Sequence, residues 1–236
     1  MIQAEHKKWA HFVFKPYIMR LLKRDFHSIH LIGDIPQIDS EQQIILTPNH
    51  STWWDGFFVY LLNEKFFQRT FYIMILEEQL AKYSFFSKLG GFSIKHNSPK
   101  KIIESLRYCS ELLEGNKPVI VTIFPQGELL PSFIRPISSN PGIAKLIGMV
   151  NRKTVVLPLA IRIEYLNEEK PQLFFKFGKA TDIIQNEKNL GELIENELDF
   201  IGNSILSNEF GKVILTGKKS ISEKSTKLAN LFKKSN

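Results

Sequence analysis

Short, continuous apolar runs bounded by polar, glycine or proline residues recur along the chain. Runs of this kind are typical of strands that are buried on both faces of a sheet. The runs are residues 44–47, 70–76, 92–94, 118–124, 154–163 and 172–178, and a further short strand and turn are expected within 28–38. Pro158 interrupts the run at 154–163. Because proline lacks the N–H that a ladder needs, we expect an edge strand or a bulge there.

The segments between these runs favour helices. Residues 99–114 give the clearest pattern, with Pro99 at the start and one apolar face. That face consists of Ile102, Ile103, Leu106, Cys109, Leu112 and Leu113. Cys109 is therefore expected in the core rather than as a nucleophile, because nothing nearby would stabilise a thiolate. Further helices are expected at 57–62, 77–89 and 141–151, and through most of the chain after 178.

The alternation of buried strands with helices predicts the fold class. It indicates a single α/β domain with a mostly parallel central sheet flanked by helices. At 236 residues the chain is long enough for one such domain with appendages. We expect the domain at residues 28–210, preceded by an amphipathic segment at 1–27 and followed by a basic helical tail at 211–236.

The amphipathic segment mixes aromatic and aliphatic side chains with lysine and arginine across residues 7–26. This composition is typical of a helix in a membrane interface, with its apolar face down and its basic residues among the headgroups. A helix that packs on its own domain with solvated lysines is the alternative. Pro16 is expected to break or kink the helix.

The amino-acid composition favours some classes of binding partner and excludes others. The chain is 43% hydrophobic and 23% charged, which is typical of a globular protein. A net charge of +7 with 19 phenylalanines favours an anionic partner such as membrane lipid, nucleic acid or an acidic carrier. Nucleic acid is disfavoured, because no recognition motif is present and the basic residues are dispersed among acidic ones. The single cysteine excludes an intrachain disulfide and a cysteine-based zinc site, and it fits a reducing compartment.

The stretch PNHSTWWDG, residues 48–56, carries the strongest candidate chemistry. It follows the apolar run at 44–47 and holds His50 and, five residues later, Asp55. Open α/β sheets bind ligands at the loops that leave the carboxyl ends of strands. A histidine there can move a proton near neutral pH, and an aspartate bonded to one ring nitrogen lets the other act as a base.

Geometry restricts this interpretation. Residues five apart on a regular helix point about 140° apart, so the two side chains meet only if His50 lies on the loop or first turn and Asp55 reaches back. The alternative is a plain helix start, with Asn49 or Ser51 as the cap and the tryptophans in the core. Ser51 as a nucleophile is a further alternative, although the Gly-x-Ser-x-Gly pattern is absent.

Four spaced blocks resemble the glycerolipid acyltransferase superfamily, in particular the bacterial 1-acylglycerol-3-phosphate acyltransferases. They are the histidine and aspartate five apart, the glycine-led block GGFSIKH at 90–96, the block FPQGE at 124–128, and the valine-proline strand VLPL at 156–159. The resemblance covers roughly residues 40–165. Four blocks in the right order, two of them at predicted strand ends, make it specific.

The resemblance implies an O-acyltransferase. A fatty acyl thioester, on coenzyme A or acyl carrier protein, would donate its acyl group to a hydroxyl of a lysophospholipid or related lipid, with no metal and no other cofactor. His50 would take the hydroxyl proton and Asp55 would hold His50, without an acyl-enzyme. Backbone N–H groups around Gly127 are candidate donors to the oxyanion. The candidate binding residues for donor or acceptor are Gly91, Lys95, His96, Phe124, Pro125, Gln126, Gly127, Glu128 and Arg135.

Departures from the family pattern change the acceptor that we expect. His96 stands where an arginine ends the glycine-led block, and Gln126 stands for a glutamate. Glu128 and Leu129 follow where threonine and arginine are usual. Arginine and lysine make the strong contacts to phosphate, whereas Glu128 would repel it. The candidate replacements are Lys95, Lys100, Lys101 and Arg135.

Three readings of the chain therefore stay open. The acceptor is a lysophospholipid, or it is a non-phosphate lipid such as a glycosylated carotenoid or an aminolipid. The third reading is a membrane lipid-binding module without turnover. In each case we expect a peripheral or monotopic protein on the cytoplasmic side of the cell membrane. The sequence has no stretch of 18 uncharged apolar residues, so no membrane-spanning helix is predicted.

Overall fold

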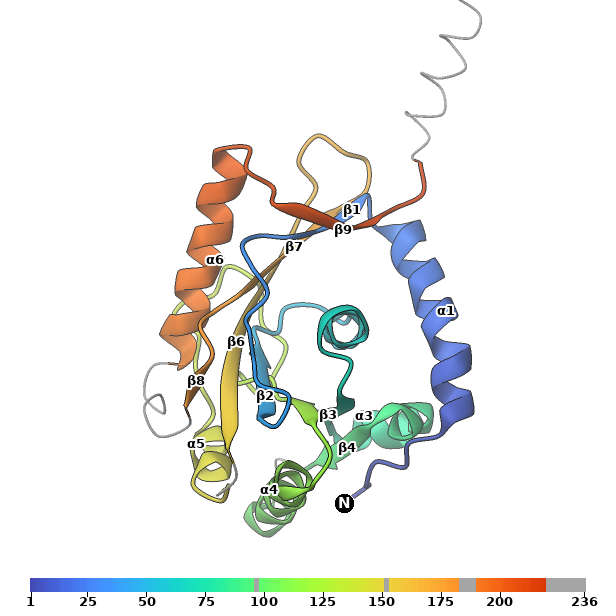
Figure 1. Cartoon of the computed structure of the whole chain (residues 1–236), viewed down its shortest axis with the longest axis vertical. Helices are drawn as coiled ribbons and strands as arrows, with labels where there is room; N and C mark the ends of the chain where they lie inside the picture. Colours follow the sequence, from blue (N-terminus) through green and yellow to red (C-terminus); the bar gives the residue numbers. More distant parts are fainter. Residues whose placement is uncertain (96–97, 151–152, 183–189, 220–236) are drawn as a thin grey trace, which may run out of the picture.

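The computed structural model describes residues 1–95, 98–150, 153–182 and 190–219 (Figure 1). These residues form an α/β domain around one mostly parallel sheet, which confirms the predicted fold class. The strands are β1 (Ser28–Leu31), β2 (Gln43–Pro48), β3 (Thr70–Leu76), β4 (Gly91–Ile94), β5 (Val119–Thr122), β6 (Thr154–Glu164), β7 (Gln172–Phe177), β8 (Thr181–Asp182) and β9 (Lys212–Thr216). The α-helices are α1 (Lys8–Asp25), α2 (Asp55–Leu62), α3 (Glu77–Lys82), α4 (Pro99–Glu114), α5 (Pro141–Ile147) and α6 (Leu190–Leu206).

The sheet has the order β4-β3-β5-β2-β6-β7-β1-β9, and β8 adds to β6. The strands from β4 to β6 are parallel neighbours, and β1 is parallel to β7. Antiparallel pairs join β7 and β8 to β6 and β9 to β1. The carboxyl ends of β2, β3 and β5 therefore lie along one edge of the sheet, where open sheets place their ligands.

Two hydrophobic layers follow from the alternation of side chains along the strands. In β2, Ile44 and Leu46 face the layer under α1 and α2, whereas Ile45 faces the layer under α4, α5 and α6. Figure 1 shows α1 and α6 on opposite sides of the sheet, as this division requires. The central strands β2 and β5 are buried along their whole length because helices cover both faces of the sheet there.

Helix α1 packs on the domain along one stripe. Ala10, Phe14, Ile18 and Leu22 are buried, and their spacing of four residues places them on one face of the helix. Helix α1 continues through Pro16, so the expectation of a break within residues 7–26 is wrong. The proline lies on the exposed side, where the carbonyl that it leaves without a partner can be hydrated.

The expectation of an edge strand at Pro158 is wrong, because β6 is central, with β2 on one side and β7 and β8 on the other. The pairing is irregular beside the proline: Val156 pairs with Thr181 and Leu159 with Phe177, so residues 157–158 face the three residues 178–180, as the alternative of a bulge requires. The carbonyl of Pro158 accepts from Gly178 N at 2.9 Å, at the junction between β7 and β8. The N–H and the carbonyl of a strand residue point to the same side, so the N–H that Pro158 lacks would also face this junction. A proline is tolerated there because no regular strand pair continues across that junction.

The sequence also misassigned three local elements. The expected helix at 77–89 divides into α3 and a 3₁₀ helix, Ser84–Leu89, and α2 continues into a π-helix at Asn63–Phe67. The chain after α6 returns as strand β9, where a helix was expected. Residues 220–236 of the predicted basic tail lie outside the described residues.

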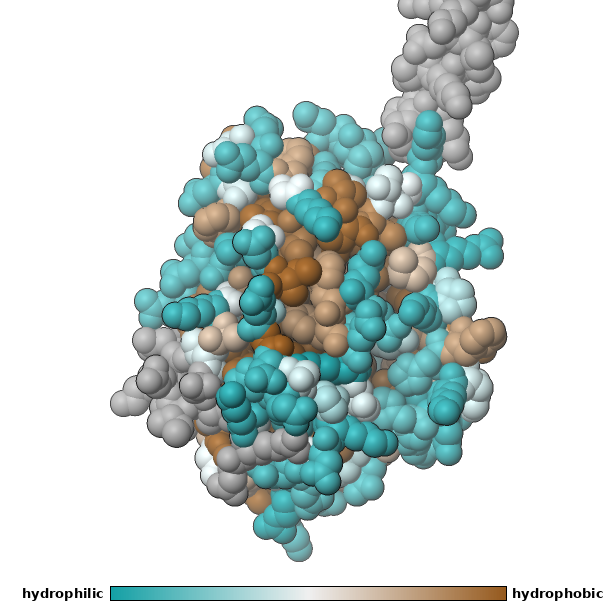
Figure 2. Space-filling model, in the orientation of Figure 1, coloured by the Kyte–Doolittle hydropathy of each residue, from teal (hydrophilic) through white to brown (hydrophobic). Residues whose placement is uncertain are grey.

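The outer surface adds two observations. In the described part of the chain, no helix is both long enough and apolar enough to cross a membrane. Figure 2 shows hydrophobic side chains gathered in the centre of one face, between α1 and α6, with hydrophilic residues around them.

Candidate active site

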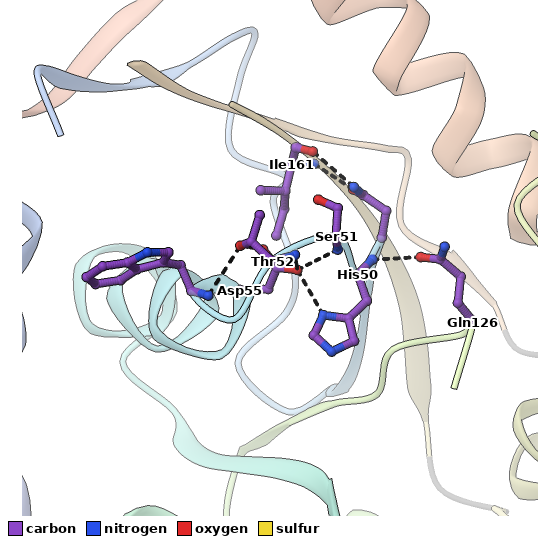
Figure 3. A network of polar contacts seen from close by, with 8 residues as sticks. His50, Ser51, Thr52, Asp55, Gln126 and Ile161 are labelled. Atoms are coloured by element: carbon purple, nitrogen blue, oxygen red, sulfur yellow. Dashed lines mark hydrogen bonds and ion pairs between the residues drawn. The ribbon is translucent and has the colours of Figure 1, made fainter. Parts of the chain in front are cut away.

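The site begins where β2 ends. Asn49 fixes the chain at this point through three hydrogen bonds to β6. Its side chain donates to the carbonyl of Ile161 at 3.0 Å and accepts from Ile161 N at 2.7 Å (Figure 3). Its own N–H donates to the carbonyl of Leu159. All of Asn49 is buried. The next residue, His50, therefore leaves the sheet from a rigid position.

His50 and Asp55 meet, as the spacing required. His50 Nδ1 lies 2.8 Å from Asp55 Oδ2 (Figure 3). Asp55 is the first residue of α2, and His50 precedes the helix in the loop, so the carboxylate reaches back across the turn. This is the arrangement in which two residues five apart can touch.

The Asp55 carboxylate is held from several sides and is fully buried. Oδ2 accepts from Ser51 N at 2.8 Å and Thr52 N at 2.9 Å, and Oδ1 accepts from the Thr52 hydroxyl at 2.6 Å. The helix N-terminus also favours negative charge at this position. Because Oδ2 is an acceptor for two N–H groups, the contact with His50 assigns the donor proton to Nδ1 and leaves Nε2 as the acceptor.

The loop after β5 holds His50 from the other side. The His50 N–H donates to Gln126 Oε1 at 2.6 Å (Figure 3). The His50 carbonyl accepts from Leu130 N at 3.0 Å. The ring of Phe124 stacks on the imidazole with centroids 4.0 Å apart and planes at 22°. Two predicted binding residues, Phe124 and Gln126, thus position the histidine.

A largely apolar cavity of about 440 Å³ opens beside His50 at the carboxyl ends of β3 and β5. Its walls include Phe57 and Tyr60 from α2, Phe71, Ile73 and Ile75 from β3, and Phe86 and Leu89 from the 3₁₀ helix. Residues near its mouth are exposed, among them Trp53, Tyr83 and Leu129. Such a cavity suits a hydrocarbon chain.

The remaining candidates lie in different places. Gly127 and Glu128 line the cavity together with Phe124, whereas Pro125 is buried beside it and accepts from Asn140 N at 2.7 Å. Gly91 packs closely against the chain: a Cβ there would lie 2.8 Å from the carbonyl oxygen of Phe86. His96 lies outside the described residues.

The cationic candidates are not in the cavity wall. Lys101 pairs with Glu77 at 3.7 Å, and Lys95 acts on the same carboxylate. Burial acts to raise the pKa of Glu77, but the surrounding positive charges and the Ser93 hydroxyl outweigh it and lower this pKa. Exposed Arg135 donates to the carbonyls of Ser132 and Ile134. Lys100 is exposed on α4.

The structure also shows the surroundings of Gly127, Ser51 and Cys109. The Gly127 N–H donates to the carbonyl of Phe124 at 3.1 Å, so it is not free to hold an oxyanion in this conformation. Ser51 contacts Asp55 through its main chain, and no hydrogen bond joins its hydroxyl to His50 among the described residues. Cys109 is fully buried, and burial raises the pKa of its thiol. The prediction of a core cysteine is therefore confirmed.

Sequence reasoning did not find most of the cavity wall. Phe71 and Phe86 read as ordinary core residues, and Phe14 reads as part of the N-terminal helix. The aromatic residues within 53–60, which include Tyr60, gave the one signal: they would suit a long apolar acceptor, with ordinary core packing as the alternative. No cluster of three or more metal-ligating side chains occurs in the described part of the chain.

Comparisons with known proteins identify the family of the chain and a solved structure with a similar fold. A family model described as Acyltransferase matches residues 28–162, which is more than half of the 236 residues. The chain belongs to the Acyltransferase family. Its fold is similar to the crystal structure of the 1-acyl-sn-glycerophosphate acyltransferase PlsC from Thermotoga maritima, with 18% identity, a TM-score of 0.53, and 87% of this chain and 84% of that chain covered. A search of curated proteins found no match.

Proposed function

We propose that this protein transfers a fatty acyl group from an acyl thioester to a hydroxyl of a lysophospholipid or related lipid, with His50 as the general base. Family membership supports acyl transfer. The observation that carries the mechanism is the 2.8 Å contact between His50 Nδ1 and buried Asp55 at the mouth of an apolar cavity. A base of this kind contributes typically about 10²–10⁴ in rate.

The proton path follows from the tautomer. The acceptor hydroxyl gives its proton to His50 Nε2 as its oxygen bonds to the thioester carbonyl carbon. The tetrahedral intermediate then expels the thiolate, which takes the proton back from Nε2. Asp55 stays ionised and balances the positive imidazole between these two steps. The products are an ester and a free thiol, and no acyl-enzyme forms.

The cavity supports the lipid character of the substrates. An acyl chain inserted among Phe71, Ile73 and Phe86 would bury apolar surface at about 25 cal/mol per Å². The donor thioester would be acyl-CoA or acyl carrier protein. A non-phosphate acceptor is the second candidate, because no lysine or arginine lines the cavity among the described residues.

A thiol-release assay tests the proposal. Purified protein is given a panel of acyl-CoA donors and acyl carrier protein, with and without single-chain hydroxyl lipids, and the ester product is identified by mass spectrometry. We expect release that requires both donor and acceptor and that falls by about 10²–10⁴ in His50→Ala. Equal turnover in a folded His50→Ala protein would remove the general-base mechanism.

We also propose that α1 attaches the protein to the membrane as a peripheral protein, on the cytoplasmic side. Trp9, Phe12, Val13 and Tyr17 are exposed on its outer face. Ring contacts run from Trp9 through Phe85, Phe14 and Phe57 to Trp53 at the cavity mouth. Packed aromatic side chains therefore connect the exposed face of α1 to the mouth of the cavity, so binding of α1 to a bilayer would bring the cavity close to the membrane surface.

Point substitutions test this attachment better than deletion, since the buried stripe of α1 contributes about 1.5–3 kcal/mol per large side chain to the core. Phe12→Ser should reduce co-sedimentation with phosphatidylglycerol vesicles. Leu206→Ser on α6 is the matched control, because both side chains are 82% exposed. Equal loss of binding in the two variants would contradict a role for α1.

A further inference from the structure

We propose that Glu128 selects the acyl acceptor, and that the preferred acceptor is a hydroxyl lipid whose headgroup carries a cationic ammonium group. The inference rests on the proposed function and deepens it, because it names the charge class of the acceptor. It starts from the charge of the cavity wall beside His50.

Glu128 is fixed next to the catalytic histidine by the loop that carries it. Gln126 accepts from the His50 N–H, and Leu130 N donates to the His50 carbonyl. The residues between these two contacts therefore arch over His50, and Gly127, Glu128 and Leu129 all line the cavity. The positive φ of 73° at Gly127 makes the tight turn that this arch needs.

Among the described residues, no positively charged side chain pairs with the Glu128 carboxylate. In the part of the chain that the structure describes, it forms no salt bridge and accepts no hydrogen bond, and the residue is exposed. Within the same part, no lysine or arginine lines the cavity, so the negative charge of Glu128 sets the formal charge of the cavity wall. A ligand charge at the mouth would meet this carboxylate first.

An acceptor that is positioned for reaction at His50 has its headgroup at the cavity mouth, near Glu128. The acylated hydroxyl must reach His50 Nε2 within hydrogen-bond distance. The alkyl chain of the acceptor has an apolar wall available, so a substituent one carbon from the hydroxyl stays at the polar mouth. A phosphate there is repelled by Glu128, and an ammonium group is attracted to it.

The size of the effect can be bounded. A unit charge about 6 Å from a carboxylate, at an effective dielectric constant of about 40, changes a rate or binding constant by a factor of about ten. The preference for a cationic over an anionic headgroup should therefore be about 10–100-fold at low salt. It should shrink as salt is added, because Glu128 is exposed.

A matched series of acceptors tests the inference. All three have one acyl chain on the first carbon of a three-carbon backbone and a free hydroxyl on the second. The third carbon carries phosphate, hydroxyl or trimethylammonium, and the last group cannot itself be acylated. The measured quantity is kcat/KM for ester formation with each acceptor, in the wild type, Glu128→Gln, Glu128→Lys and the surface control Glu192→Gln on α6.

We expect the wild type to favour the trimethylammonium acceptor over the phosphate acceptor. This ratio should fall about tenfold or more in Glu128→Gln, should favour phosphate in Glu128→Lys, and should be unchanged in Glu192→Gln. A ratio that Glu128→Gln leaves unchanged would overturn the inference while the proposed function stands. So would a wild type that favours the phosphate acceptor. Failure to acylate any of the three would overturn both.

Discussion

Two histidines of the same sheet region, His50 in the loop after β2 and His30 within β1, have similar neighbours. His50 stacks on Phe124 with centroids 4.0 Å apart, and His30 stacks on Phe174 at 4.9 Å. Each has a hydroxyl residue nearby in sequence, Ser51 and Ser28. The Ser28 hydroxyl even lies 2.6 Å from His30 Nε2, which is the geometry of a serine nucleophile and its base.

Their surroundings separate the two. The His50 side chain is 23% exposed, lines a cavity and bonds to a carboxylate. His30 is buried and has the neutral partner Gln172 at 3.1 Å. Burial lowers the pKa of His30, only partly offset by its hydrogen bond to Gln172. A histidine beside a serine is thus not a site by itself; access for a substrate and a partner for the charged form make the difference.

The largest expected effect comes from removing the charge partner of His50. Asp55→Asn keeps the size of the side chain and an acceptor oxygen, but it no longer balances a positive imidazole. We expect turnover to fall by about 10²–10⁴, and the free energy of unfolding to fall by about 1–3 kcal/mol because buried donors lose their carboxylate. Single-turnover rates and urea melts measure the two losses.

Asp199→Asn, at an exposed position of α6, is the control for Asp55→Asn. It should change neither turnover nor stability appreciably. An Asp55→Asn protein with wild-type turnover would show that His50 acts without its carboxylate, and the contrast with His30 would then rest on access alone.

A smaller effect is expected from His30→Phe. Phenylalanine can keep the ring contacts with Phe174 and Phe210, and Ser28 can still donate to Gln172 at 3.1 Å. Turnover should stay within about twofold, because His30 does not touch the cavity. A large loss of turnover with unchanged stability would mean that the two histidines are coupled.

The same variant should change the acid sensitivity of the fold. The pKa of His30 is lower in the folded state than its usual value of 6.5, so the unfolded chain binds more protons below pH 6.5. The contribution of His30 to the free energy of unfolding is therefore complete above pH 6.5 and is lost as the pH falls below it. Burial, helped by neighbouring His11, lowers the pKa of His6 to about 4, so His6 adds to this loss between pH 6.5 and 4.

Urea melts between pH 7 and pH 4 measure this loss. The slope of the unfolding free energy should be shallower in His30→Phe than in the wild type, and shallower still when His6→Phe is added. Identical slopes in all three proteins would show that other groups control the acid response.

The sequence predicted the elements that depend on local pattern. The apolar runs located the central strands, and the face of residues 99–114 located α4 with Cys109 in the core. The spacing of His50 and Asp55 predicted their contact, because a reach across a helix start is a local event. Strand β9 was missed, since Val213, Ile214 and Leu215 form a run too short to stand out among polar neighbours.

The rest of the site depends on distant parts of the chain. The hydrogen bond from the His50 N–H to Gln126 joins two loops whose register is set by the pairing of β2 with β5. The cavity wall combines Phe14 of α1 with residues of α2, β3 and the 3₁₀ helix. No pattern within a single window contains that information, because it arises only when the layers pack.

The place of β1 in the sheet has a consequence for the order of folding. Ser28 of β1 pairs with Gln172 on one side and with Thr216 on the other. During synthesis on the ribosome, β1 must therefore wait for both late strands, whereas β3 and β4 can pair as soon as they emerge. Contacts between such distant residues slow folding, and until β9 arrives β1 has an open edge that a second unfinished chain could join.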